Sequence, residues 1–237
     1  MPPAAARSLL SHAVELGREV RAVARQGQLI AAARNRATPT IPGERVVIFV
    51  HGFMAAGPVF DPMRAFVEQR APVGTIDITY GPLERFDRAV DRLASIVDRV
   101  AEGRRVDIVG HSLGGIVARW YLQERGGATH VDRLVTLASP HAGTRAARVA
   151  MGPLVAGSLL EAIRPDSHVI RMLREGRARA SRVLHTAVVA GLDRMVTPPE
   201  SAASIDDATI HWLDDVGHNE MLFEPRAFAH VHDGLTR

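Results

Sequence analysis

The short stretch GHSLG, residues 110–114, places a serine between small residues at the end of an apolar run. It fits the pattern Gly-x-Ser-x-Gly, in which a serine hydroxyl stands on a sharp turn between a strand and a helix. The glycines leave room for the two backbones to approach, and the N–H groups of the following helix favour negative charge beside the hydroxyl. The pattern predicts that Ser112 is a nucleophile.

A serine nucleophile needs a base, and the base needs an acid that orients it. In proteins with this motif, the three catalytic residues occur along the chain in the order serine, acid, histidine. Asp193 lies in GLDRMVTPP beyond an expected strand, and His218 lies in LDDVGHNEMLF beside the flexible Gly217. We therefore predict that Asp193 is the acid and His218 the base, and keep as alternative acids Asp206, Asp207, Asp214 and Asp215.

Negative charge that develops on the substrate needs two backbone donors. The first is the N–H group of Leu113, which directly follows the nucleophile. The second belongs to the loop after the first core strand, where VVIFV (46–50) runs into His51-Gly52-Phe53. Gly52 lets the backbone turn so that a donor points inward. We predict that the Phe53 and Leu113 N–H groups form an oxyanion hole.

These residues must be positioned by strands and helices that alternate along the chain. Alternation of this kind predicts an α/β fold with parallel strands and helices on both faces of the sheet. The stretch 143–180 is irregular and lies between two strands, where an insertion over a site would be placed. We expect strands at 46–50, 73–80, 105–110, 131–139, 182–190 and 209–213, and helices at 61–69, 83–101, 113–124 and 224–232.

The composition is that of a globular protein large enough for a sizeable core, with 237 residues, 46% hydrophobic and 23% charged. All 29 basic side chains are arginines, and they are interleaved with acidic residues. Nucleic-acid binding would need a concentrated basic face with aromatic residues, which make up only 5%, so we predict no nucleic-acid partner. The absence of cysteine excludes disulfides, thiolate nucleophiles and cysteine metal sites.

Apolar residues recur at about helical spacing from Leu9 to Val23, which predicts an amphipathic helix that ends before the Pro-rich stretch 37–43. We expect this helix to pack on the rest of the protein, and a surface- or lipid-facing arm is the alternative. Charges such as Glu15 and Arg18 interrupt any apolar stretch that a signal peptide or membrane span would need. We therefore expect a cytoplasmic protein, with peripheral membrane contact as the alternative.

Several stretches of the sequence are typical of one protein family, and they follow one another in the same order as in that family: VVIFVHGF (46–53), VDIVGHSLGGIVARWYL (106–122), LVTLASPHAGT (134–144), VVAGLDRMVTP (188–198) and VGHNEMLF (216–223). With them the chain resembles the bacterial lipase and esterase branch of the α/β-hydrolase superfamily. The resemblance implies an α/β-hydrolase domain over 45–237, with a mostly parallel central sheet and a small helical cap or lid at about 143–180. Residues 1–44 lie outside it as an N-terminal helical extension.

The resemblance also implies a hydrolase of carboxylic esters, with lipid-like acyl esters as the expected substrates and no cofactor. It implies that Met54, Leu154 and Leu159 line the acyl pocket, and that His141, at the start of the cap, is structural. We expect no metal site, because the acidic residues near His218 are typical of surface carboxylates.

Other functions use the same residues and stay open: acyl transfer to an alcohol, thioester cleavage, or binding without catalysis. A membrane-associated role of the N-terminal helix is a further alternative. The expected partner is a small-molecule or lipid ester. We expect transient contact with a lipid surface at most, and no obligate protein partner.

Overall fold

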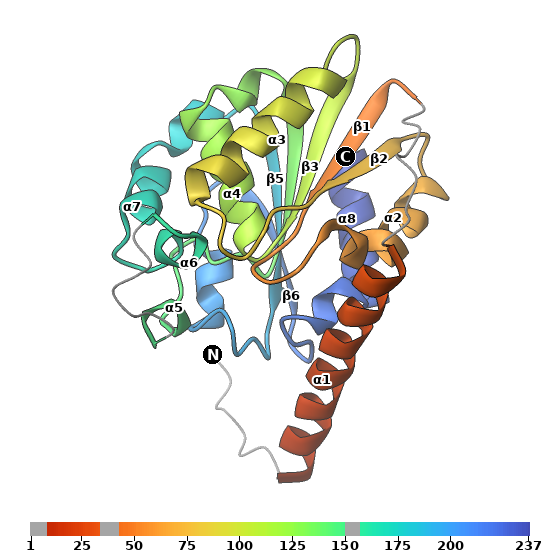
Figure 1. Ribbon diagram of the computed structural model, residues 1–237, viewed down its shortest axis with the longest axis vertical. Helices are drawn as coiled ribbons and strands as arrows, with labels where there is room; N and C mark the ends of the chain where they lie inside the picture. Colours follow the sequence, from red (N-terminus) through yellow and green to blue (C-terminus); the bar gives the residue numbers. More distant parts are fainter. Residues whose placement is uncertain (1–8, 34–42, 150–156) are drawn as a thin grey trace.

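The computed structural model describes residues 9–33, 43–149 and 157–237. Its centre is a six-stranded sheet in the order β2-β1-β3-β4-β5-β6, and every neighbouring pair is parallel (Figure 1). The predicted α/β class with a parallel sheet is confirmed. The strands are β1 (Arg45–Val50), β2 (Gly74–Ile78), β3 (Arg105–His111), β4 (Val131–Leu137), β5 (Leu184–Ala190) and β6 (Ala208–Leu213).

The continuous apolar runs of the strands are explained by burial on both faces of the sheet. In β1, Val46, Ile48 and Val50 face one core cluster, while Val47 and Phe49 face the other. Each such side chain stabilises the fold by about 1.5–3 kcal/mol through removal of apolar surface from water. The first cluster is covered by α3 (Phe86–Val100) and α4 (Leu113–Glu124), and the second by α2 (Asp61–Glu68) and α8 (Pro225–Thr236).

The predicted catalytic residues all lie at the same end of the sheet, where the carboxyl ends of the parallel strands meet. The chain adds β2 on one side of β1 and β3 on the other, so the winding reverses between β1 and β3. Crevices at such reversals, at the carboxyl ends of the strands, are the usual binding places of parallel sheets. Val50 is paired with Gly110, so the loops that follow β1 and β3 start side by side.

Some element boundaries differ from the predictions for identifiable reasons. The strand expected at 131–139 ends at Leu137, because Ala138 adopts a positive φ of 47° that extended strands do not use. The helix expected at 83–101 begins only at Phe86, because Arg85 is extended and forms an isolated bridge with Ser158. The last helix continues beyond the expected residue 232 to Thr236.

The described parts of the irregular stretch 143–180, which are residues 143–149 and 157–180, form short helices near α4 (Figure 1). Ser158 and Ser167 begin two of them, since each side chain accepts a hydrogen bond from a backbone N–H group in the first turn. The elements are α5 (Ala146–Val149), α6 (Leu159–Ala162), α7 (His168–Glu175) and η4 (Arg177–Ala180).

The N-terminal helix α1 (Leu9–Ala32) packs beside the carboxyl edge of the sheet (Figure 1). Its inward face combines polar and apolar residues, because Gln26 is buried there and Ile30 packs against the second core cluster. Its outward face carries Leu16, Val20 and Val23, whose exposed fractions are 53%, 60% and 54%. The expected helix is present, but its stripe of Leu16, Val20 and Val23 does not pack inward. Among the described helices, none has the length and apolar character to span a membrane.

Candidate active site

Ser112 stands on a strained turn between β3 and α4. Its φ of 54° and ψ of −125° lie outside the regions that non-glycine residues prefer, which costs about 1–3 kcal/mol. The turn is held because the Ser112 N–H group donates to the Leu137 carbonyl at 2.8 Å. Strain of this kind is characteristic of functional positions, where the surrounding structure fixes the conformation. The Ser112 side chain remains half-buried at the carboxyl edge of the sheet.

The glycines around Ser112 are required by close packing. A Cβ atom on Gly110 would lie 2.6 Å from the Gly115 Cα atom. A Cβ atom on Gly114 would collide with the Val50 carbonyl oxygen, and one on Gly115 with the Ser139 side chain. The motif therefore lets α4 start directly against β1 and β4.

The two predicted oxyanion donors come from neighbouring loops. Leu113 is the first residue of α4, and N–H groups in the first turn of a helix have no partner inside it. Phe53 follows β1, and its side chain packs against the core cluster under α3 and α4. A Cβ atom on Gly52 would lie 3.0 Å from the Ser112 Cβ atom, a tight contact that the glycine avoids where this loop approaches Ser112.

His51 fixes the loop that carries Phe53, a role that the sequence did not reveal. The His51 Nε2 atom accepts from the Tyr80 N–H group at 3.1 Å, so Nδ1 carries the proton and donates to the Gly52 carbonyl at 2.7 Å. The Tyr80 hydroxyl donates to the His51 carbonyl, and the two rings stack with centroids 4.1 Å apart. Burial lowers the pKa of His51 to about 4, so its ring stays neutral.

The structure brings Asp193 and His218 together although 25 residues separate them. The His218 Nδ1 atom lies 2.7 Å from the Asp193 Oδ2 atom, and both side chains are buried. The other carboxylate oxygen, Oδ1, accepts from the N–H groups of Met195 and Val196 at 2.8 and 2.7 Å. Asp193 is thereby locked in one orientation, and Nε2 of His218 is the ring nitrogen left for proton transfer.

His218 differs from the other buried histidines in its charge balance. Burial lowers the pKa of His111 and His185 to about 3, and that of His141 well below its ordinary value. Burial also lowers the pKa of His218, but the charge and hydrogen bond of Asp193 more than offset it, so its pKa is raised. His218 is thus the buried histidine best suited to accept a proton near neutral pH.

Ser112 is linked to this pair through its neighbour His111. The His111 Nε2 atom lies 3.1 Å from the His218 carbonyl oxygen, where it can donate a hydrogen bond. The rings of the two histidines lie with centroids 4.8 Å apart. Ser112 therefore directly follows a residue that contacts the proposed base. The pattern Gly-x-Ser-x-Gly leaves the position before the serine open, so the sequence did not indicate this contact.

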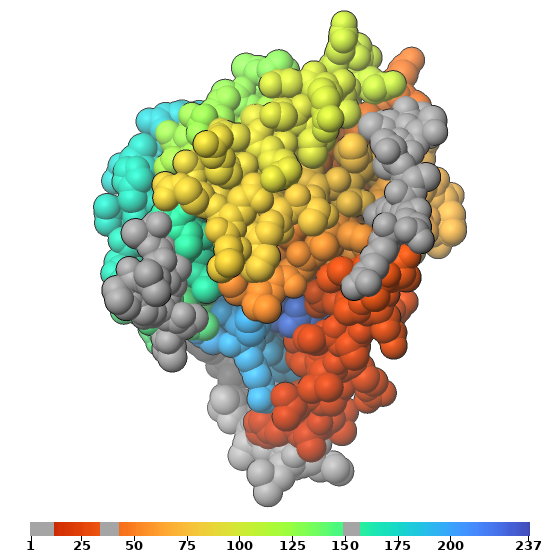
Figure 2. Space-filling model, in the orientation of Figure 1, coloured from red at the N-terminus to blue at the C-terminus, as the bar shows by residue number. Residues whose placement is uncertain are grey.

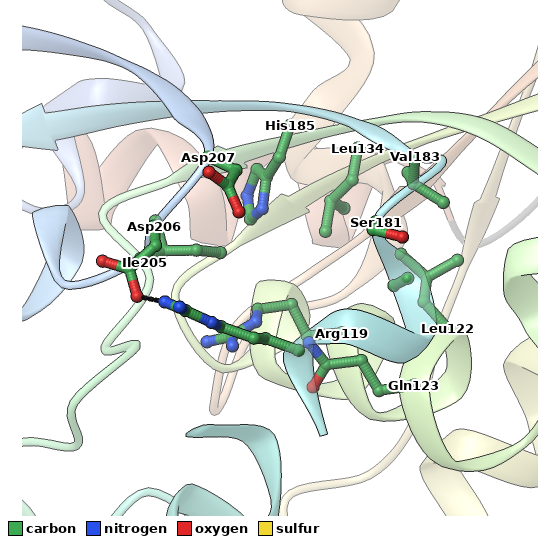
Figure 3. A pocket seen from close by; sticks show the side chains of 12 residues that line it. Arg119, Leu122, Gln123, Leu134, Ser181, Val183, His185, Ile205, Asp206 and Asp207 are labelled. Atoms are coloured by element: carbon green, nitrogen blue, oxygen red, sulfur yellow. Dashed lines mark ion pairs between the residues drawn. The ribbon is translucent and has the colours of Figure 1, made fainter. Parts of the chain in front are cut away.

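The alternative acids face other partners. Asp215 forms an ion pair with Arg226 at 3.0 Å, and Asp206 pairs with Arg177. Asp206 and Asp207 border a cavity of about 60 Å³ between α4 and β5, shown in Figure 3. This cavity is separate from the candidate site, because its lining includes neither Ser112 nor the Asp193–His218 pair.

The predicted pocket residues have different environments. Met54 is 73% exposed on the loop after β1, where its φ is 57°. Leu159 has no exposed surface and belongs to the core beneath α3 and α4, so in this conformation it supports the fold instead of lining an open pocket. Leu154 lies outside the described residues.

Two further cavities differ in their relation to the candidate site, because only the second is lined by one of its residues. One of about 340 Å³ lies between the start of α3 and the helices α6 and α7, and its lining includes Phe86, Ser158 and His168. Another of about 180 Å³ lies between α1 and the loops that carry Asp193 and His218, and Leu16 and His218 contribute to its lining. Within 9–33, 43–149 and 157–237, acidic and histidine side chains form no group of three or more arranged for a metal ion.

Comparison with known proteins identifies the family and the fold. A family model described as palmitoyl protein thioesterase matches residues 46–192, which is more than half of the chain. The chain belongs to the palmitoyl protein thioesterase family. The matched region includes the Ser112 turn and the loop after β1, and it ends directly before Asp193. The His218 loop and α1 therefore lie outside the part of this family member that the model matches.

Solved structures of lipases share the fold. Lipase B of Aspergillus fumigatus is 18% identical with a TM-score of 0.70, over 82% of this chain and 53% of the lipase. A mature Bacillus licheniformis lipase is 16% identical with a TM-score of 0.60, over 84% and 94%. A monoacylglycerol lipase of Paleococcus ferrophilus is 17% identical with a TM-score of 0.59, over 84% and 96%.

The chain thus spans about half the length of the A. fumigatus lipase and nearly all of the other two. No curated protein matches the sequence significantly. The family and the fold together support an α/β-hydrolase of the class that acts on esters or thioesters. This confirms the resemblance on which the sequence-based expectation rested.

Proposed function

We propose that this family member cleaves lipid-like acyl esters through a covalent acyl-enzyme on Ser112. The observation that carries the proposal is the buried 2.7 Å hydrogen bond between Asp193 and His218, at the sheet edge where Ser112 is held on its strained turn. Nucleophilic acyl transfer needs a serine hydroxyl that a substrate can reach and a base that is oriented by a buried acid, and Ser112 is half-buried, so part of its surface is accessible.

In the first half-reaction the Ser112 oxygen attacks the acyl carbonyl carbon, and Nε2 of His218 takes the hydroxyl proton. Asp193 stabilises the resulting imidazolium through Nδ1. The Phe53 and Leu113 N–H groups hold the oxyanion, and in other enzymes one such donor contributes about 100- to 1,000-fold to turnover. The intermediate collapses when His218 gives its proton to the leaving alcohol, and the acyl group stays on Ser112.

In the second half-reaction a water molecule replaces the alcohol. His218 removes a proton from the water, and the hydroxide equivalent attacks the acyl carbon. Breakdown returns the proton to the Ser112 oxygen and releases the carboxylic acid. No step of this cycle requires a metal or an organic cofactor, because charge is carried by the imidazole and the backbone donors.

Thioester cleavage is the second candidate, and membership of the palmitoyl protein thioesterase family favours it. The same residues serve both reactions, since a thiolate leaves in place of an alcohol. A thiol is the better leaving group and needs less help from His218 as a general acid. Replacing His218 therefore slows hydrolysis of the acyl-enzyme with either kind of substrate. It slows formation of the acyl-enzyme more with an oxygen ester than with a thioester.

The proposal is tested by replacing Ser112 with alanine and measuring nitrophenol release from nitrophenyl esters of increasing chain length. We expect activity in the unmodified protein and its loss in Ser112→Ala. Ser95→Ala is the matched control, because Ser95 is exposed on α3 and its hydroxyl bonds only to its own helix, at the Asp91 carbonyl. Activity that survives in Ser112→Ala would refute the assignment.

Ester and thioester specificity are separated by paired substrates with the same acyl chain. Initial rates on a palmitoyl oxygen ester and on a palmitoyl thioester of a small thiol give the ratio directly. Product analysis with a competing alcohol distinguishes hydrolysis from acyl transfer, because a transferase accumulates the new ester. Ester hydrolysis as the main function predicts turnover of the oxygen ester and free acid as the product.

A further inference from the structure

Glu19 of α1 binds the loop that carries His218. The Glu19 carboxylate accepts hydrogen bonds from the Asn219 N–H group at 3.0 Å, the Asn219 side-chain amide at 3.1 Å and the Glu220 N–H group at 3.1 Å. A carboxylate that accepts several such bonds holds its donors in one arrangement, because charge-assisted bonds are stronger than neutral ones. The two residues after His218 are thus fixed by a side chain 200 positions earlier in the chain.

The residue before His218 is also adapted to Glu19. A Cβ atom on Gly217 would collide with the Glu19 carboxylate, so only a glycine allows this approach. Glu19 therefore lies against the backbone on both sides of His218. The Glu19 side chain is only partly exposed. It borders the cavity of about 180 Å³ between α1 and the loops that carry Asp193 and His218.

Further contacts keep α1 in register with the loop. The Gln26 side-chain amide donates to the Asn219 side-chain carbonyl at 2.8 Å. Arg18 donates to the Asp215 carbonyl at 2.9 Å and lies 3.3 Å from the Glu220 carboxylate. Figure 2 shows α1 (red) beside blue surface from the C-terminal part of the chain. These partners explain the polar residues on the inward face of α1.

We propose that Glu19 is a positioning residue for His218, which makes α1 a working part of the active site. This inference rests on the proposed role of His218 as the base. Glu19 acts through the backbone on both sides of His218, and it touches neither the substrate nor the reacting atoms. Orientation of this kind matters, because a misplacement of about 1 Å costs on the order of 100-fold in rate.

The electrostatics support the same role. Burial lowers the pKa of His218 and Asp193 raises it, and the charge of Glu19 adds to the raising effect. Replacement of Glu19 by glutamine removes this charge and places an amide N–H₂ group among donors. The loop that carries His218 is then held less firmly, and the His218 imidazole is a weaker proton acceptor.

The test is the full pH profile of a soluble short-chain nitrophenyl ester with Glu19→Gln in the complete chain. We expect kcat to fall on the order of 10- to 100-fold while KM stays unchanged, because the loop and not the substrate site is altered. We also expect the acid limb of kcat/KM to move to lower pH, since the pKa of His218 falls. Glu19→Asp should restore part of kcat and the position of the acid limb.

Glu15→Gln is the matched control. Glu15 lies one turn earlier on α1 and borders the same cavity, and its carboxylate pairs with Arg194 at 3.8 Å. We expect its kcat and pH profile to match those of the unmodified protein. Gln26→Ala removes one loop contact without changing charge, so it should lower kcat by a smaller factor and leave the acid limb in place.

Unchanged kcat and an unchanged acid limb in Glu19→Gln would overturn the inference, and so would a loss of thermal stability with unchanged kcat. If Glu19→Gln does not fold, kcat is measured for Gln26→Ala and Glu19→Asp instead, and an unchanged kcat in both variants overturns the inference. Failure of the proposed function is distinguished by Ser112→Ala, which would then retain activity whatever the Glu19 variants do.

Discussion

The two halves of the candidate site are held in different ways. The nucleophile half consists of the loops after β1 and β3, and it is fixed mainly by backbone packing between adjacent strands and by glycines at close approaches. The bonds between His51 and Tyr80 add to the hold on the first loop. The acid–base half, the loops after β5 and β6, is fixed by side-chain hydrogen bonds, including those that come from α1. The geometry of the nucleophile half therefore tolerates little added side-chain volume. The geometry of the acid–base half depends on charged side chains and on α1, which is distant in the sequence.

The largest effect is expected in the nucleophile half, from Gly114→Val. The added side chain would meet the Val50 carbonyl, a part of the backbone that cannot move without disrupting β1. We expect little folded protein and no esterase activity, measured by circular dichroism and nitrophenol release. Gly81→Ala is the control, because a Cβ atom there meets no atom within 4 Å. Folded, active Gly114→Val would show that the packing is less strict than described.

Asp193→Asn should have the next largest effect, now in the acid–base half. The amide no longer accepts from Nδ1 with a full charge and favours the wrong tautomer, a change that costs about 10⁴-fold in serine proteases. The fold should be retained, unlike in Gly114→Val.

The pH profile sharpens this second prediction. Because the pKa of His218 is raised above 6.5, the acid limb of kcat/KM should lie above that pH in the unmodified protein. Only the neutral imidazole accepts the serine proton, so activity rises as pH increases through this pKa. The limb should move to lower pH in Asp193→Asn, because the largest raising influence is removed. An acid limb that stays in place would contradict the assigned pair.

The difference between the halves also explains what the sequence could predict. The requirements of the Ser112 turn are local, so five neighbouring residues and the flanking apolar runs indicate strand, turn and helix together. Asp193 and His218 could be inferred from chain order and from their loops. The contact between Glu19 and the His218 loop gave no local signal, because the residues are far apart in the chain and the apolar spacing of α1 suggested the opposite face.

A smaller effect is expected from Tyr80→Phe, which affects the loop after β1 through one hydrogen bond. The change removes the hydroxyl that donates to the His51 carbonyl and leaves the stacked ring in place. A buried hydrogen bond of this kind stabilises by about 1 kcal/mol, so kcat should fall on the order of 5-fold. Tyr121→Phe on the far part of α4 is the control. Steady-state rates of both variants decide whether the loop is as firmly held as the Ser112 turn.

The most direct test of the central claim is covalent labelling with a fluorophosphonate, followed by mass spectrometry of the intact chain and its peptides. The account predicts one adduct per chain, on the peptide that contains Ser112, and a labelling rate that falls to background in His218→Gln. An adduct on another residue, or labelling at Ser112 that proceeds equally fast without His218, would contradict a relay formed by Ser112, His218 and Asp193.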